Sequence, residues 1–119
     1  MAQHNELGRL GEQVARDYLL ARGYAIDGIN IRIGGVEIDF IARKDDRLCF
    51  VEVKTRRDDF ADPLETINDK KRRRMIRAAD LYMQRSEVDL APQFDIIVII
   101  GTPDGYTLEH IPDAFYPGV

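Results

Sequence analysis

Two stretches of alternating apolar and polar residues, 36–43 and 48–56, flank a short charged segment, 44–47. Both stretches have a period of two and are rich in β-branched and aromatic residues, which is typical of strands joined as a hairpin. With Asp45 and Asp46 as the turn, Lys44 pairs with Arg47, and this register fixes every later pair. The pattern therefore predicts a β-hairpin in which Asp39 lies opposite Glu52.

Alternation also assigns the side chains of the hairpin to two faces. One face carries Glu37, Asp39, Glu52 and Lys54, and the other carries the apolar pairs Phe40/Val51, Ile38/Val53 and Ala42/Cys49. Opposed carboxylates about 4.5 to 5.5 Å apart at Cβ repel each other. A divalent cation bound by Asp39 and Glu52 would relieve this repulsion, with Lys54 orienting a metal-bound water. The alternative is a solvated outer face on which Glu37 and Lys54 form a simple ion pair.

The remaining pattern predicts two helices and three more strands. Apolar residues at steps of three and four predict a helix over 5–22, ended by Gly23, and a second helix over 66–85. Strands are expected at 24–33, at the buried run 94–100 and at the edge 106–111, with an irregular tail. Turns are expected at Gly34 and Gly35 and at 101–105, and a loop at 57–65. The order αβββαββ predicts an α/β fold, a mixed β-sheet flanked by helices.

Each predicted helix carries a charged residue that could lie near the acids of the hairpin. Glu12 lies at the margin of the apolar stripe of the first helix, where a solvated carboxylate is the alternative interpretation. Lys71 lies on the inward line of the second helix, which is unusual unless its ammonium reaches an acid. The other basic residues of this segment, Arg72, Arg73 and Arg74, point to other faces of the helix. They form either a solvated surface or one that contacts phosphates.

Composition limits the class of protein. A chain of 119 residues with 45% hydrophobic residues predicts one domain over 1–119. No apolar run is long enough to span a bilayer and the start lacks a signal peptide, so we expect a cytoplasmic protein with no membrane partner. The single Cys49 excludes an internal disulfide and is expected in the core, and the isolated His4 and His110 anchor no catalytic triad.

The charge of the chain is unevenly distributed. The net charge is −4, which argues against strong non-specific binding to nucleic acid. However, residues 41–80 hold twelve of the seventeen Lys and Arg residues, whereas residues 81–119 hold only Arg85 against six acids. This distribution is compatible with one basic face that binds phosphates. Such binding would be weak and would depend on the salt concentration.

Asp39 followed by Glu52-x-Lys54, after a helix with Gly11-Glu12, resembles the PD-(D/E)xK nuclease superfamily with its restriction-endonuclease-like αβββαβ core. More narrowly, the chain resembles the uncharacterised YraN-type family, which is described as related to archaeal Holliday-junction resolvases. The similarity covers nearly the whole chain and includes Asn30-x-Arg32, Glu37-Ile38-Asp39, residues 50–56, Lys71 and Phe94-Asp95. One departure is Val36, which separates Gly34-Gly35 from the acids, where the family usually has Gly directly before them.

The resemblance implies hydrolysis of phosphodiester bonds in DNA, branched or structured DNA included, with Mg²⁺ or Mn²⁺ as cofactor. It implies that Asp39 and Glu52 are catalytic metal ligands, that Lys54 activates or orients water, and that Glu12 is an outer catalytic carboxylate. The expected nucleic-acid-binding residues are Arg56, Lys71, Arg72, Arg73 and Arg74. A homodimer is also implied, since a two-fold junction needs two sites. The alternative is a catalytically silent nucleic-acid-binding or protein-interaction module of the same fold.

Overall fold

A computed structural model describes residues 2–57 and 67–115, with side chains described from residue 8 onward. Its elements are α1 (Ala2–Ala21), β1 (Ala25–Ile33), β2 (Val36–Lys44), β3 (Arg47–Arg56), α2 (Asp69–Ser86), β4 (Ala91–Thr102) and β5 (Gly105–Phe115). The predicted order αβββαββ is confirmed. The loop predicted at 57–65 lies outside the described residues, apart from Arg57, which forms a bend.

The five strands form one mixed sheet in the order β1-β2-β3-β4-β5. Neighbouring strands are antiparallel except β3 and β4, which run parallel and are connected through α2. The strand predicted over 94–100 belongs to β4, which lies between two neighbours and is buried from Phe94 to Ile99. These features confirm the predicted α/β class and are compatible with an αβββαβ nuclease-like core.

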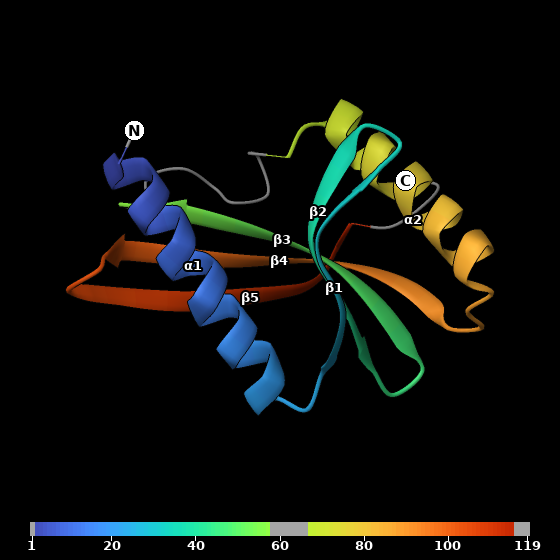
Figure 1. Ribbon diagram of the computed structural model, residues 1–119, viewed down its shortest axis with the longest axis horizontal. Coiled ribbons are helices and arrows are strands. Elements are labelled where there is room, and N and C mark those ends of the chain that lie inside the picture. Colours follow the sequence, from blue (N-terminus) through green and yellow to red (C-terminus); the bar gives the residue numbers. More distant parts are fainter. Residues whose placement is uncertain (1, 58–66, 116–119) are drawn as a thin grey trace.

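Two separate apolar cores lie on the two faces of the sheet. Ile96 and Val98 pack with Met75 of α2, whereas Ile97 and Ile99, which alternate with them along β4, pack with the buried residues of α1. Because neighbouring strand residues point to opposite faces, α1 and α2 cover opposite sides of the sheet. Figure 1 shows α1 crossing the sheet and α2 lying beyond the curled hairpin of β1 and β2.

The hairpin of β2 and β3 has the predicted register only near its turn. Lys44 pairs with Arg47 and the ladder continues to Phe40 opposite Val51, where the described pairing ends. Ile38 packs on the α2 side, although Phe40, two residues later, packs on the α1 side. The prediction that Ile38 shares a face with Phe40 and Val53 is therefore wrong.

The face exchange in β2 is matched by one in β1. Ile29 packs on the α1 side and Ile31 on the α2 side, and Asn30 between them has φ 51°. A left-handed residue interrupts the regular alternation of side chains, because alternation requires extended backbone on both sides. The two strands change face together at Asn30 and Asp39, and the outer part of their hairpin turns away from β3.

Several boundaries differ from the prediction. Helix α2 begins at Asp69, three residues later than predicted, because the side chain of Asn68 caps it by accepting a hydrogen bond from the amide of Lys71 at 2.8 Å. The tail was predicted to be irregular, but β5 continues to Phe115, whose ring stacks on Phe94 with centroids 5.0 Å apart. The predicted end of α1 is confirmed, since Gly23 follows it with φ 89°.

No helix within the described ranges is both long and apolar enough to cross a membrane.

Candidate active site

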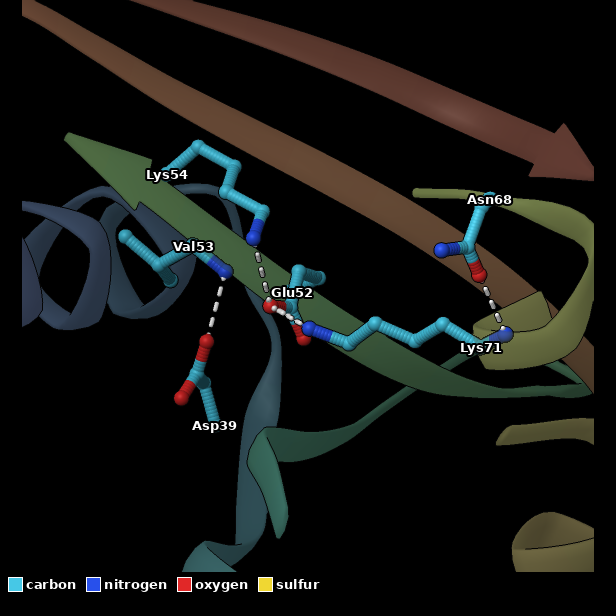
Figure 2. Close-up of polar contacts among 6 residues, drawn as sticks. All are labelled: Asp39, Glu52, Val53, Lys54, Asn68 and Lys71. Carbon is cyan, nitrogen blue, oxygen red and sulfur yellow. Dashed lines mark hydrogen bonds and ion pairs between the residues drawn. The ribbon is translucent and has the colours of Figure 1, made fainter. Parts of the chain in front are cut away.

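Asp39 lies where β2 separates from β3. Its Oδ2 accepts a hydrogen bond from the backbone amide of Val53 at 2.8 Å, so a side chain replaces the strand backbone as the partner of this amide (Figure 2). The regular cross-strand pair of Asp39 and Glu52 predicted from the sequence is not formed. The physical reason is the change of face at Asp39, which opens a fork between the two strands.

The predicted pair of Glu37 and Lys54 is also not formed. Glu37 is exposed and its Oε2 lies 3.8 Å from Nη2 of Arg32, across β1 and β2. Lys54 instead places its Nζ 3.3 Å from Oε1 of Glu52 on its own strand. The fork therefore removes Glu37 from the cluster and leaves Lys54 on Glu52.

Glu52 is the most enclosed acid of the candidate site. Its Oε1 also contacts Nζ of Lys71 at 2.7 Å, and Figure 2 shows both ammonium groups converging on this one oxygen. Only 6% of Glu52 is exposed. The prediction that the inward-facing Lys71 reaches an acid is confirmed, and the first turn of α2 is thereby joined to β3.

The environment of Asp39 disfavours its charged form. Burial, followed by the negative charge of Glu52, raises the pKa of Asp39 from 3.8 to about 6, although the amide of Val53 and the charge of Lys71 act in the opposite direction. The two carboxylates are therefore close enough to interact through the opening between the strands. An added positive charge near Asp39 would stabilise its ionised form.

A hollow of about 170 Å³ adjoins Asp39 on the side of α1. Glu12 and Gly8 line it from α1 and Thr55 lines it from β3. Oε1 of Glu12 accepts a hydrogen bond from Nδ2 of Asn30 at 3.0 Å, so the residue that breaks β1 also orients this carboxylate. Glu12 thus faces the same space as Asp39.

Gly11 allows α1 to lie close to the sheet at this point. A Cβ atom at Gly11 would overlap the Cγ2 methyl of Thr55 on β3. At Gly8, in contrast, a Cβ atom would meet no described atom within 4 Å. Close packing explains Gly11, and the same contact sets the position of Glu12 beside the hollow.

The donor set of the site fits a hard divalent cation. Across residues 2–57 and 67–115, no three His, Cys, Asp or Glu side chains form a compact cluster that could hold a metal ion by itself. Mg²⁺ typically keeps several waters and binds through one or two carboxylates together with substrate phosphates. Asp39 and Glu52 supply two carboxylates of this kind. Because the surroundings of Asp39 disfavour its charged form, a bound cation would favour its ionisation.

The predicted nucleic-acid-binding residues are not equivalent. Arg72 is engaged within the protein, since its Nε donates to the carbonyl of Ile67 at 2.9 Å and its guanidinium lies 5.8 Å from the ring centroid of Phe115. Arg73 and Arg74 are exposed on α2, and Arg56 is half-buried at the end of β3. Arg73 and Arg74 are therefore better placed than Arg72 to meet an external phosphate.

The sequence analysis missed a second polar network. Nε2 of His110 lies 2.8 Å from Oδ2 of the fully buried Asp95, and Nδ1 of His110 lies 2.9 Å from the hydroxyl of Tyr18. Asp95 also accepts hydrogen bonds from the side chain of Gln93 and the amide of Asp113. A lone Asp in an apolar strand was the available signal, because a buried carboxylate needs partners. The network ties α1 to β4 and β5.

Cys49 offers no nucleophile. It is 1% exposed in the α1-side core, as predicted, and burial raises the pKa of its thiol to about 12. Since the thiolate is the reactive form, Cys49 has a packing role.

The sheet, its two helices and the acids at the fork define an α/β protein with a restriction-endonuclease-like core. The model of the family described as Uncharacterised protein family UPF0102 matches residues 11–99, and the chain belongs to this family, which lies in the restriction-endonuclease-like nuclease superfamily. The predicted resemblance to the YraN-type family is thus confirmed.

Bacterial relatives match the chain from end to end. A UPF0102 protein of Bacteroides thetaiotaomicron is 46% identical over 98% of both chains. A UPF0102 protein of Phocaeicola vulgatus is 42% identical over 100% of this chain and 99% of its own length, and one of Christiangramia forsetii is 39% identical over 98% of both. None of these names states an activity.

Proposed function

We propose that this protein is a cytoplasmic Mg²⁺- or Mn²⁺-dependent endonuclease that hydrolyses phosphodiester bonds in DNA, with branched or structured DNA as its preferred substrate. The observation that carries this proposal is the placement of Asp39, Glu52 and Lys54 at one fork between β2 and β3. Two carboxylates and an ammonium in this arrangement would supply metal ligands and a proton-handling group together.

Each residue of the site has a different role in this proposal. Asp39 and Glu52 would hold the cation, which supplies Lewis-acid stabilisation of the phosphate charge and a more acidic water. Lys54, with its ammonium beside Glu52, orients the attacking water and stabilises negative charge as it develops. Glu12 adds a carboxylate on the far side of the hollow, held there by Asn30, and orients water from that side.

The basic surface would supply affinity rather than chemistry. Arg73 and Arg74 present two exposed cations on α2, the helix whose first turn reaches Glu52 through Lys71. Phosphate contacts of this kind position a duplex without reading its sequence. A homodimer with two such sites would suit a two-fold branched substrate.

The second candidate is a catalytically silent nucleic-acid-binding module. The observation in its favour is that Glu52 is contacted by two ammonium groups of the protein itself. In this case Lys54 and Lys71 neutralise a buried acid, and no chemistry follows.

Single-turnover cleavage and equilibrium binding, measured on linear, flapped and four-way DNA with Mg²⁺ or Mn²⁺, separate the two candidates. Lys54→Ala should lower the chemical rate by about 10² or more while barely changing DNA affinity. The double variant Arg73→Ala, Arg74→Ala should do the reverse and reduce the salt dependence of binding. Arg85→Ala, at the other end of α2, controls for the loss of an arginine elsewhere on the same helix.

A different result would favour the binding module. If the wild type binds these DNAs without cleaving any of them, and Lys54→Ala weakens binding as much as the paired arginine change, the endonuclease proposal fails.

A further inference from the structure

Oε1 of Glu52 carries two cations in the structure. Nζ of Lys71 lies 2.7 Å from this oxygen and Nζ of Lys54 lies 3.3 Å from it. Two ammonium groups on one oxygen repel each other, and the nearby negative charge of Asp39 offsets part of this repulsion. A metal cation bound to Glu52 would compete with the ammonium of Lys71 for this oxygen.

The two lysines differ in how they are held. Lys54 lies on the same strand as Glu52, two residues further along, whereas Lys71 reaches Glu52 from the first turn of α2. The backbone of Lys71 is fixed by the cap of Asn68, but its side chain is 36% exposed, compared with 7% for Glu52. A lysine has a flexible four-carbon stem and its charge can move while its backbone stays in place. The side chain of Lys54 is 25% exposed, so Lys71 is the more exposed of the two lysines and the one that can turn to a ligand outside the protein without leaving its own helix.

We propose that Lys71 is an exchangeable counter-ion, which holds Glu52 in the free protein and passes to a substrate phosphate when a divalent cation takes its place. This inference rests on the proposed function and adds a coupling between the two ligands of the site. A cation on Glu52 releases Lys71 for the phosphate, and a phosphate that attracts Lys71 uncovers Glu52 for the cation. Each ligand therefore strengthens binding of the other by the same factor.

The coupling predicts a specific effect of removing the ammonium of Lys71. In Lys71→Met, whose unbranched side chain is nearly as long, Mn²⁺ no longer has to displace the ammonium of Lys71 from Glu52. The dissociation constant of Mn²⁺ for the DNA-free protein, measured by isothermal titration calorimetry, should fall about tenfold, which corresponds to 1.4 kcal/mol. Lys70→Met removes the same charge from the preceding, exposed position of α2 and should change this constant little.

DNA binding gives the second readout. Ca²⁺ serves as a non-reactive probe cation, and anisotropy of a labelled four-way DNA measures affinity. In the wild type, Ca²⁺ should tighten DNA binding, and in Lys71→Met most of this tightening should be lost. Glu52→Gln should tighten metal-free DNA binding, because it releases Lys71, and adding Lys71→Met should abolish that gain. If Glu52→Gln tightened DNA binding only by removing a negative charge, the gain in affinity would persist when Lys71→Met is added.

The outcomes separate the inference from the proposed function. If the wild type binds neither Mn²⁺ nor Ca²⁺, both are overturned. If the wild type binds Mn²⁺ but Lys71→Met and Lys70→Met bind it equally well, Lys71 is not a counter-ion exchanged for metal, and the metal site itself stands. Circular dichroism of each variant confirms that its fold is retained.

Discussion

Asp39→Asn should stabilise the metal-free protein at neutral pH. The side chain of Asn keeps an oxygen that can accept from the amide of Val53, and it removes the charge that burial and Glu52 disfavour. The folded-state pKa of Asp39 is about 6, compared with an ordinary value of 3.8. This difference corresponds to a cost of at most about 3 kcal/mol when Asp39 is ionised in the folded protein.

The sign of the pH dependence follows from the direction of this shift. Well below pH 3.8 the carboxyl is protonated in both the folded and the unfolded state, and Asp39 has no ionisation cost. Between pH 4 and 6 the folded state binds more protons than the unfolded state, so a rise in pH lowers the free energy of unfolding. Above pH 6 the full cost is present, and the advantage of Asn is largest.

Thermal and urea unfolding in EDTA, between pH 4 and 8, measures the difference between Asp39→Asn and the wild type. The two should differ little near pH 4, and at pH 8 the variant should melt up to about 10 °C higher, given the usual unfolding entropy of a chain of this size. Asp17→Asn, on the exposed face of α1, controls for loss of one charge. A difference that does not change with pH, or a variant less stable than the wild type at pH 8, would refute the reasoning.

Two further predictions concern local structure. Gly11→Ala should cost about 1–3 kcal/mol of unfolding free energy, because its methyl group would overlap Thr55. Gly8→Ala should instead stabilise α1 by about 0.5–1 kcal/mol. Urea denaturation of the two variants tests this contrast, and equal effects would contradict it. Asn68→Ala should cost about 1 kcal/mol through loss of the cap of α2, seen as a lower melting temperature, and Asn68→Ser should restore most of it; an unchanged melting temperature in Asn68→Ala would show that the cap contributes little.

Much of the fold could be predicted because its signals are local. The charged turn at Asp45 and Asp46 set the register of the hairpin, and alternating side chains identified its strands. The buried run of β4 was identified by its apolar, β-branched content. The inward position of Lys71 on its helix was enough to predict an acidic partner, which proved to be Glu52.

The fork could not be predicted by the same reasoning. Extrapolating the register to Asp39 assumes a regular strand, and the left-handed Asn30 breaks that regularity from the neighbouring strand. Asn is one of the few residues enriched in that conformation, but the same residue is common in ordinary turns. The pairing of Asp95 with His110 was also hidden, since it depends on the antiparallel contact of β4 with β5.

The parallel pairing of β3 with β4 also sets the order in which the site assembles during folding. A short turn brings Asp39 and Glu52 together through local contacts, whereas β3 pairs with β4 only after the chain has crossed over through α2, with Arg47 meeting Ala91. Such distant pairing has a larger loop-closure cost and is slower. Because Lys71 is carried by the crossover helix, its charge reaches Glu52 only at that late stage. The contact of Lys71 with Glu52 therefore forms together with the crossover, whereas the contact of Lys54 with Glu52 needs only β3 itself.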